Sequence, residues 1–136
     1  METLTFEDNI KVFGKEVPTF PAGIDDAFTE LINATGDVAG KRNYYGISYM
    51  NNDGKIIYKA AAEEKYTGEA EQYHYTTSTI EKGKYYYKKV EDWRSKTNCI
   101  NQVFHEIMQD NRVNKHTPAI ELYKNDDEML CMVKAL

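Results

Sequence analysis

The sequence predicts an α+β fold made of duplicated βαββ repeats, with two helices packed on one face of an antiparallel sheet. Two segments of the chain carry apolar residues at helical spacing, and most other apolar residues alternate as they do in strands. Each predicted helix follows a strand and precedes two strands that are joined by a tight turn. Because this order of elements occurs twice, it indicates an internal repeat. Strands and helices in this arrangement are typical of the α+β class.

The first repeat begins with a strand and a helix. Residues 3–18 alternate weakly between apolar and polar, which predicts a strand that bends near Gly14. A helix is predicted over 22–35, with Gly36 as its stop. Apolar residues recur there at i, i+3, i+4, i+7 and i+8, as expected for one face of a helix, and they are Ile24, Ala27, Phe28, Leu31 and Ile32.

A hairpin completes the first repeat. Residues 37–43 are interpreted as a loop, and residues 44–50 as a strand. The segment 51–54 reads Asn-Asn-Asp-Gly, and these residue types tolerate the positive φ that tight hairpin turns need. The return strand is therefore predicted over 55–63.

The second repeat is predicted to follow the same plan. A polar segment over 63–72 is interpreted as a linker between the two halves. Residues 73–90 are expected to be β-structure with a break at 82–84. A second helix is predicted over 92–110 from its apolar spacing, and a polar loop follows over 111–117.

The C-terminal hairpin, over 118–133, poses the main functional question. Alternation along its first strand places Ile120 and Leu122 on one face, which we expect to pack on a helix. Glu121 and Tyr123 then share the other face. Either that face is solvated, as one face of an antiparallel sheet often is, or it lines a pocket in which Glu121 is the charged group.

Composition excludes several classes of protein. The 136 residues are enough for a single domain, 1–136, with a hydrophobic core. The formal net charge is −5, which disfavours direct binding of nucleic acid, since such binding depends on neutralising phosphates. No apolar run is as long as a membrane span and no signal peptide opens the chain, so we expect a cytoplasmic protein that does not bind a membrane.

Metal ions and cofactors are not expected either. The two cysteines, Cys99 and Cys131, form neither a CxxC motif nor a zinc-ligand spacing. The three histidines are scattered along the chain and form no HExxH motif. The more informative feature is the high tyrosine content, because tyrosine is favoured both in strands and at binding surfaces.

Four short stretches of the sequence are informative together: Phe20-Pro21-Ala22-Gly23-Ile24, Tyr44-Tyr45-Gly46-Ile47, Gly83 with Tyr85, and above all Ile120-Glu121-Leu122-Tyr123. They resemble the gyrase-inhibitor-like (GyrI-like) superfamily, which includes the effector-binding domains of AraC-type and MerR-type bacterial transcription regulators. The resemblance covers nearly the whole chain. The regulators also carry a helix-turn-helix domain, and no segment here corresponds to one, so the chain resembles the stand-alone members.

The resemblance implies a fold of two βαββ repeats related by pseudo-twofold symmetry, here about 1–64 and about 73–136. It also implies a ligand cleft between the repeats that is lined by aromatic rings. In the multidrug-binding members of the superfamily, a buried glutamate on a late strand meets cationic, aromatic ligands. Glu121 stands where that glutamate would be.

Five residues are therefore candidates for ligand binding, and no residue is assigned as catalytic. They are Glu121, Tyr123, Tyr45, Tyr85 and Trp93. A carboxylate among apolar rings is costly to keep charged, so such a site selects a ligand that brings positive charge and a flat apolar surface. Aromatic faces add a cation–π attraction of about 0.5–2 kcal/mol per good contact.

The expected function is that of a stand-alone effector-binding domain for a hydrophobic, cationic aromatic ligand. Two alternatives stay open from the sequence, and catalysis is favoured less than binding. In the first, a GyrI-like small-molecule hydrolase, Glu121 would act as general base on a water beside a tyrosine hydroxyl. In the second, the chain would bind a protein partner, as a gyrase inhibitor does. Homodimer formation is left open as well.

Overall fold

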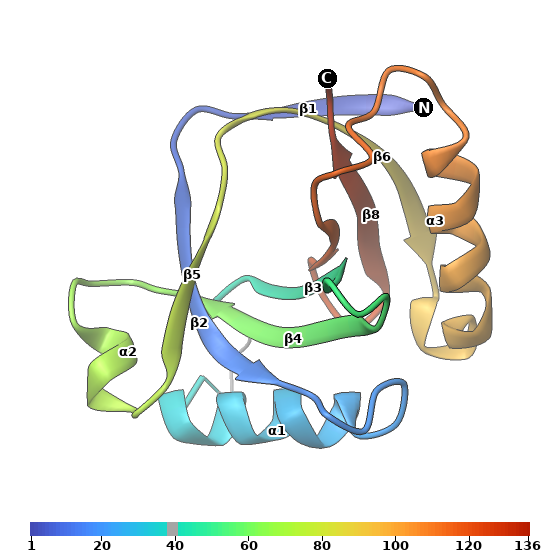
Figure 1. The fold of residues 1–136 in the computed structure, drawn as a ribbon. Coiled ribbons are helices and arrows are strands. Elements are labelled where there is room, and N and C mark those ends of the chain that lie inside the picture. The colour runs from blue at the N-terminus through green and yellow to red at the C-terminus, as the bar shows by residue number, and fades with distance from the viewer. Residues whose placement is uncertain (38–40) are drawn as a thin grey trace.

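A computed structural model describes residues 1–37 and 41–136, and its main feature is one curled, eight-stranded antiparallel sheet (Figure 1). Its strands are β1 (Glu2–Phe6), β2 (Ile10–Glu16), β3 (Tyr44–Met50), β4 (Ile56–Glu63), β5 (Thr76–Ile80), β6 (Gly83–Glu91), β7 (Ala119–Tyr123) and β8 (Glu128–Lys134). The helices are α1 (Ile24–Thr35), α2 (Glu69–Gln72) and α3 (Ile100–Met108), and two short 3-10 turns, η1 (Trp93–Ser95) and η2 (Thr97–Cys99), precede α3.

The strand order is symmetric about the centre of the sheet. The order is β1-β6-β8-β7-β3-β4-β2-β5, and all neighbouring strands are antiparallel. The hairpins β3–β4 and β7–β8 lie side by side through the β3–β7 pair, and the outer strands follow in matching positions on either side. The predicted α+β class with two main helices on a sheet is therefore confirmed. The repeat boundaries, 1–64 and 73–136, stay a prediction.

Helix α1 forms where its apolar spacing predicts it. Ala27 and Leu31 are buried against the sheet beneath β2 and β4 (Figure 1). Gly36 ends the helix in a left-handed conformation with φ of 69°, and its N–H is donated to the carbonyl oxygen of Ile32. Glycine adopts this conformation without the steric cost that a side chain brings.

Helix α3 is shorter than the helix predicted over 92–110. Asp92 adopts a left-handed φ of 51°, and Lys96 separates the two 3-10 turns with a φ of −120°. These two residues interrupt any α-helix over the segment, so regular helix begins only at Ile100. Trp93 consequently lies in η1 rather than in the first turn of a long helix.

The other N-terminal and central predictions need smaller corrections. The segment 3–18 forms two strands, β1 and β2, rather than one strand bent near Gly14. The predicted linker over 63–72 contains the short helix α2. The predicted loop over 37–43 includes residues 38–40, which lie outside the described residues.

Both main helices cover the same face of the sheet. One hydrophobic cluster packs α1 on β2, β3 and β4, and a second packs α3 on β6 and β8. Tyr123, on β7, contributes to both clusters and so lies between the two helix-covered regions. We call this side of the sheet the helix face.

The opposite face, here called the inner face, is covered by the sheet itself. Its hydrophobic cluster draws on all eight strands, including Leu4 and Phe6 on one edge strand and Ile80 on the other. Ile120 and Leu122 belong to this cluster. The expectation that they pack on a helix is therefore wrong, because the curled sheet buries this face with residues from its own strands.

A buried ion pair ties α2 to the segment that leads into β3. Arg42 Nη1 donates to Glu69 Oε1 at 2.6 Å, and the two side chains are only 7% and 1% exposed. The same carboxylate oxygen accepts a hydrogen bond from the backbone N–H of Lys65.

None of the helices of the described residues is long and apolar enough to cross a membrane.

We predict that Glu69→Gln lowers the free energy of unfolding by about 3 kcal/mol, because it leaves the buried Arg42 charge without its partner. Urea denaturation measures this loss. The control is Asp126→Asn, which breaks the exposed pair between Arg94 and Asp126 and should change the denaturation midpoint little. Equal effects of the two substitutions would show that the buried Arg42–Glu69 pair contributes no more to the free energy of unfolding than an exposed pair does.

Candidate ligand-binding site

Glu121 lies at the centre of the helix face and is held by two tyrosine hydroxyls. It is the middle residue of β7, and its side chain is only partly exposed. The hydroxyl groups of Tyr58 and Tyr123 both donate to Glu121 Oε1, each at 2.7 Å. Tyr58 comes from β4, so its side chain must cross β3 to reach β7.

Gly46 makes this crossing sterically open. It lies on β3, where it pairs with Ala60 of β4 on one side and with Glu121 of β7 on the other. A Cβ atom at this position would overlap both the Tyr58 hydroxyl oxygen and Glu121 Oε1. Only glycine at this position therefore leaves room for the hydrogen bond between β4 and β7.

Further aromatic rings pack on the two tyrosines that hold the carboxylate. The ring centroid of Tyr123 lies 5.2 Å from that of Phe28 on α1 and 4.9 Å from that of Trp93 in η1, both in edge-to-face geometry. Phe20 stacks on Tyr58 with centroids 4.9 Å apart. The rings come from the segment before α1, from α1 and from η1, and thus from both halves of the chain.

The carboxyl group of Glu121 is electrostatically unusual. Burial raises its pKa above the usual range, and the hydrogen bonds from Tyr58 and Tyr123 oppose this shift only in part. Burial, together with the nearby carboxylate, raises the pKa of both tyrosines, so they remain protonated donors. Within residues 1–37 and 41–136, no lysine, arginine or histidine forms an ion pair with Glu121.

The five residues proposed from the sequence divide between the two faces. Glu121, Tyr123 and Trp93 come together on the helix face, as described above. Tyr45 and Tyr85 belong to the inner-face cluster and are buried there. The Tyr85 hydroxyl donates to the Glu81 carbonyl oxygen at 2.7 Å. The thickness of the sheet therefore separates these two tyrosines from Glu121.

Four residues around the carboxylate were not among the sequence-based candidates: Tyr58, Gly46, Phe20 and Phe28. Alternation along β4 does place Tyr58 on the same face as Ala60 and Ala62, but not opposite Glu121. The register of β3 against both β4 and β7 makes that contact, and this register is not a local property of the sequence. Phe28 was recognisable only as part of the apolar face of its helix.

The donor groups present do not suggest a metal centre. Among the described residues, no group of three or more histidine, cysteine, aspartate or glutamate side chains is arranged to hold a metal ion. The chemistry that Glu121 and the two tyrosines offer is that of one carboxylate, two hydroxyl donors and apolar ring surfaces.

Comparisons with known proteins bear on the fold. No protein-family model and no curated protein matches the sequence. Among solved structures, the integron cassette protein VCH_CASS2 from the mobile metagenome of Vibrio cholerae has a TM-score of 0.69 at 13% identity, covering 99% of this chain and 95% of that one. The chain shares its fold.

Two further structures are similar to this chain. The protein SAV2435, solved bound to tetraphenylphosphonium, has a TM-score of 0.67 at 17% identity over 98% of this chain and 93% of its own. A candidate bacterial transcription regulation protein from Staphylococcus aureus MU50 has a TM-score of 0.58 at 17% identity over 98% and 96% of the two chains. This fold agrees with the resemblance to the GyrI-like superfamily that the sequence motifs indicate.

We predict that Gly46→Ala lowers the free energy of unfolding by about 1–3 kcal/mol, because the new methyl group displaces the Tyr58 and Glu121 side chains. Chemical denaturation checks this. The matched background is Tyr58→Phe, in which the overlapping hydroxyl is absent, so Gly46→Ala should cost less there. If the penalty were the same in both backgrounds, the overlap at the hydroxyl would not be its cause.

The raised pKa of Glu121 predicts a pH-dependent difference between the wild type and Glu121→Gln. Between the ordinary glutamate pKa of about 4.3 and the raised native value, the native state binds more protons at this group than the unfolded state does. This group therefore makes the wild type less stable as pH rises through that window.

Glu121→Gln keeps an acceptor for the tyrosines without the charge, so its stability relative to the wild type should increase with pH. Urea denaturation between pH 4 and pH 8 measures the difference. A constant difference across this range would show that the carboxyl group titrates normally in the folded protein.

Proposed function

We propose that this chain is a small-molecule-binding domain whose ligand is a hydrophobic, cationic aromatic compound held against Glu121. The observation that carries this proposal is the set of groups around the carboxylate. Its oxygen accepts hydrogen bonds from two tyrosine hydroxyls, aromatic rings from both halves of the chain pack on these tyrosines, and no basic side chain of the described residues forms an ion pair with it. The missing positive charge is what a cationic ligand would supply.

The energetics favour this class of ligand over a neutral one. Burial raises the pKa of a carboxyl group and so disfavours its ionised form. A nearby cation stabilises the ionised form and lowers the pKa again. The faces of Trp93, Tyr123 and Phe28 would add cation–π attraction and apolar contact area. The two tyrosine hydroxyls hold the carboxylate in one position, which reduces the entropy lost on binding.

The structural neighbours are consistent with this proposal. SAV2435, which shares the fold, was solved bound to tetraphenylphosphonium, a lipophilic aromatic cation. The similarity to the candidate transcription regulation protein supports a relation to the sensor domains of bacterial regulators. At 17% identity, these similarities support a shared fold only. The ligand class is therefore argued from the side chains around Glu121.

The test is a titration with tetraphenylphosphonium and with triphenylphosphine oxide, a neutral compound of similar shape. Trp93 is the only tryptophan in the chain and contacts Tyr123, so its fluorescence reports binding directly. We expect Glu121→Gln to weaken the cation about tenfold or more, as the loss of a charged partner does, and to leave the oxide nearly unchanged. Glu71→Gln, an equal change of charge at an exposed position on α2, serves as the control.

Equal losses for the cation and the neutral compound, or no loss for either, would overturn the proposal. One further observation would then favour the hydrolase alternative: a carboxyl group with a raised pKa next to tyrosine hydroxyls is suited to general-base catalysis. Turnover of an activated ester such as 4-nitrophenyl acetate, abolished by Glu121→Gln, would support that alternative.

A further inference from the structure

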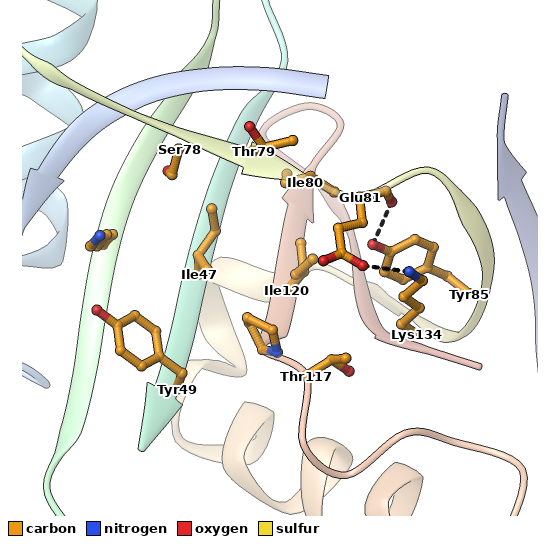
Figure 2. A pocket seen from close by; sticks show the side chains of 12 residues that line it. Ile47, Tyr49, Ser78, Thr79, Ile80, Glu81, Tyr85, Thr117, Ile120 and Lys134 are labelled. Atoms are coloured by element: carbon orange, nitrogen blue, oxygen red, sulfur yellow. Dashed lines mark hydrogen bonds and ion pairs between the residues drawn. The ribbon is translucent and has the colours of Figure 1, made fainter. Parts of the chain in front are cut away.

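A cavity of about 190 Å³, shown in Figure 2, lies on the inner face of the sheet, and Glu121 is not among its lining residues. Its floor is apolar and consists of Ile47 on β3, Ile80 on β5 and Ile120 on β7. These three side chains are buried in the inner-face cluster. Pro118 and the ring of Tyr49 also line the cavity. An apolar floor with a few polar groups is the lining that is typical of small-ligand sites.

At one end of this cavity, the polar groups satisfy one another. Lys134 Nζ donates to Glu81 Oε2 at 2.5 Å, and the Tyr85 hydroxyl donates to the Glu81 carbonyl oxygen (Figure 2). The ion pair has no net charge, and burial raises the pKa of Tyr85 to about 12, so its hydroxyl stays a donor. At this end of the cavity, the charged and polar groups are therefore already paired with one another, and no charge is left for a ligand.

The other cation of the cavity is Lys59 on β4. It is partly buried, and its ammonium group lies 5.7 Å from the centroid of the Tyr49 ring. Glu16 is its register partner on β2, yet within the described part of the chain no carboxylate forms an ion pair with Lys59. The charges of Lys134 and Glu81 cancel, so the charged side chains that line the cavity carry one net positive charge, that of Lys59.

We infer that the inner-face cavity is a second ligand site, which takes a small monocarboxylate with a compact apolar body. The carboxylate would meet the Lys59 ammonium, and the apolar body would lie on Ile47, Ile80 and Ile120. The hydroxyl group of Ser78, which also lines the cavity, can donate to the second carboxylate oxygen.

Size limits the ligand further. The volume of about 190 Å³ is below the roughly 300–1,000 Å³ that is typical of sites for drug-sized molecules. An acid with a single ring or a short branched chain fits this limit, whereas a compound with several rings does not. The two sites thus differ in ligand charge and ligand size as well as in the face of the sheet that they occupy.

The test uses benzoate as probe, with benzamide as a neutral compound of the same shape and benzylammonium as a cation. Binding is followed by NMR through the backbone amide signals of the full chain. We expect saturable shifts at Ile47, Ser78 and Ile120 with benzoate, weaker shifts with benzamide and none with benzylammonium. The amides of Phe28 and Trp93, which lie on the helix face against Tyr123, should not respond, and this separates the result from cation binding at Glu121.

The decisive variant is Lys59→Met, which keeps the apolar stem and removes the charge. We expect it to weaken benzoate about tenfold, as the loss of a charge-assisted hydrogen bond does. Lys55→Met, an equal change of charge just before β4 and outside the cavity, should leave the affinity unchanged. Ser78→Leu, which fills the cavity, should also reduce binding.

Three outcomes would overturn the inference. They are the absence of saturable benzoate binding, equal binding of benzoate and benzamide, and benzoate binding that survives in Lys59→Met. Tetraphenylphosphonium binding at Glu121 is measured separately by Trp93 fluorescence, so either proposal can fail without the other.

Discussion

The pairing of β3 with β7 is the interaction on which the rest of the structure depends. It joins the two hairpins into one sheet and sets Gly46 opposite Glu121. Because Gly46 has no side chain, Tyr58 can pass over β3 at this position and reach the carboxylate. A slip of one residue would turn Glu121 toward the inner face and Ile120 toward the helices. The two halves of the chain and the candidate site therefore share one constraint.

The sheet separates two chemically different environments. On the helix face, β7 presents a carboxylate among aromatic rings, and on the inner face the same strand presents Ile120 to a cavity with an unmatched lysine. Strand β3 contributes in the same way, with Gly46 on one side and Ile47 on the other. Since successive residues of a strand point to opposite faces, two short strands suffice to line both sites.

The arrangement around Glu121 costs stability rather than adding to it. The partly buried Glu121 carboxylate loses much of its hydration, and two neutral tyrosine donors replace only part of that loss. Glu69 is fully buried, but Arg42 neutralises its charge. Local rules of stability are commonly broken at functional sites and compensated elsewhere in the fold. The contrast between the two glutamates therefore supports the proposal that Glu121 binds a ligand.

Local patterns in the sequence determined much of this fold. Helical spacing located α1, turn-forming residues located the β3–β4 hairpin, and alternation put Glu121 and Tyr123 on one face, because each of these signals depends on residues close together in the chain. Tertiary structure alone decided which face the helices cover, that Tyr45 and Tyr85 lie on the opposite side from Glu121, and that Tyr58 contacts it. These features depend on strand register and on the curl of the sheet, which arise from pairings between residues far apart in sequence, such as Tyr58 and Glu121.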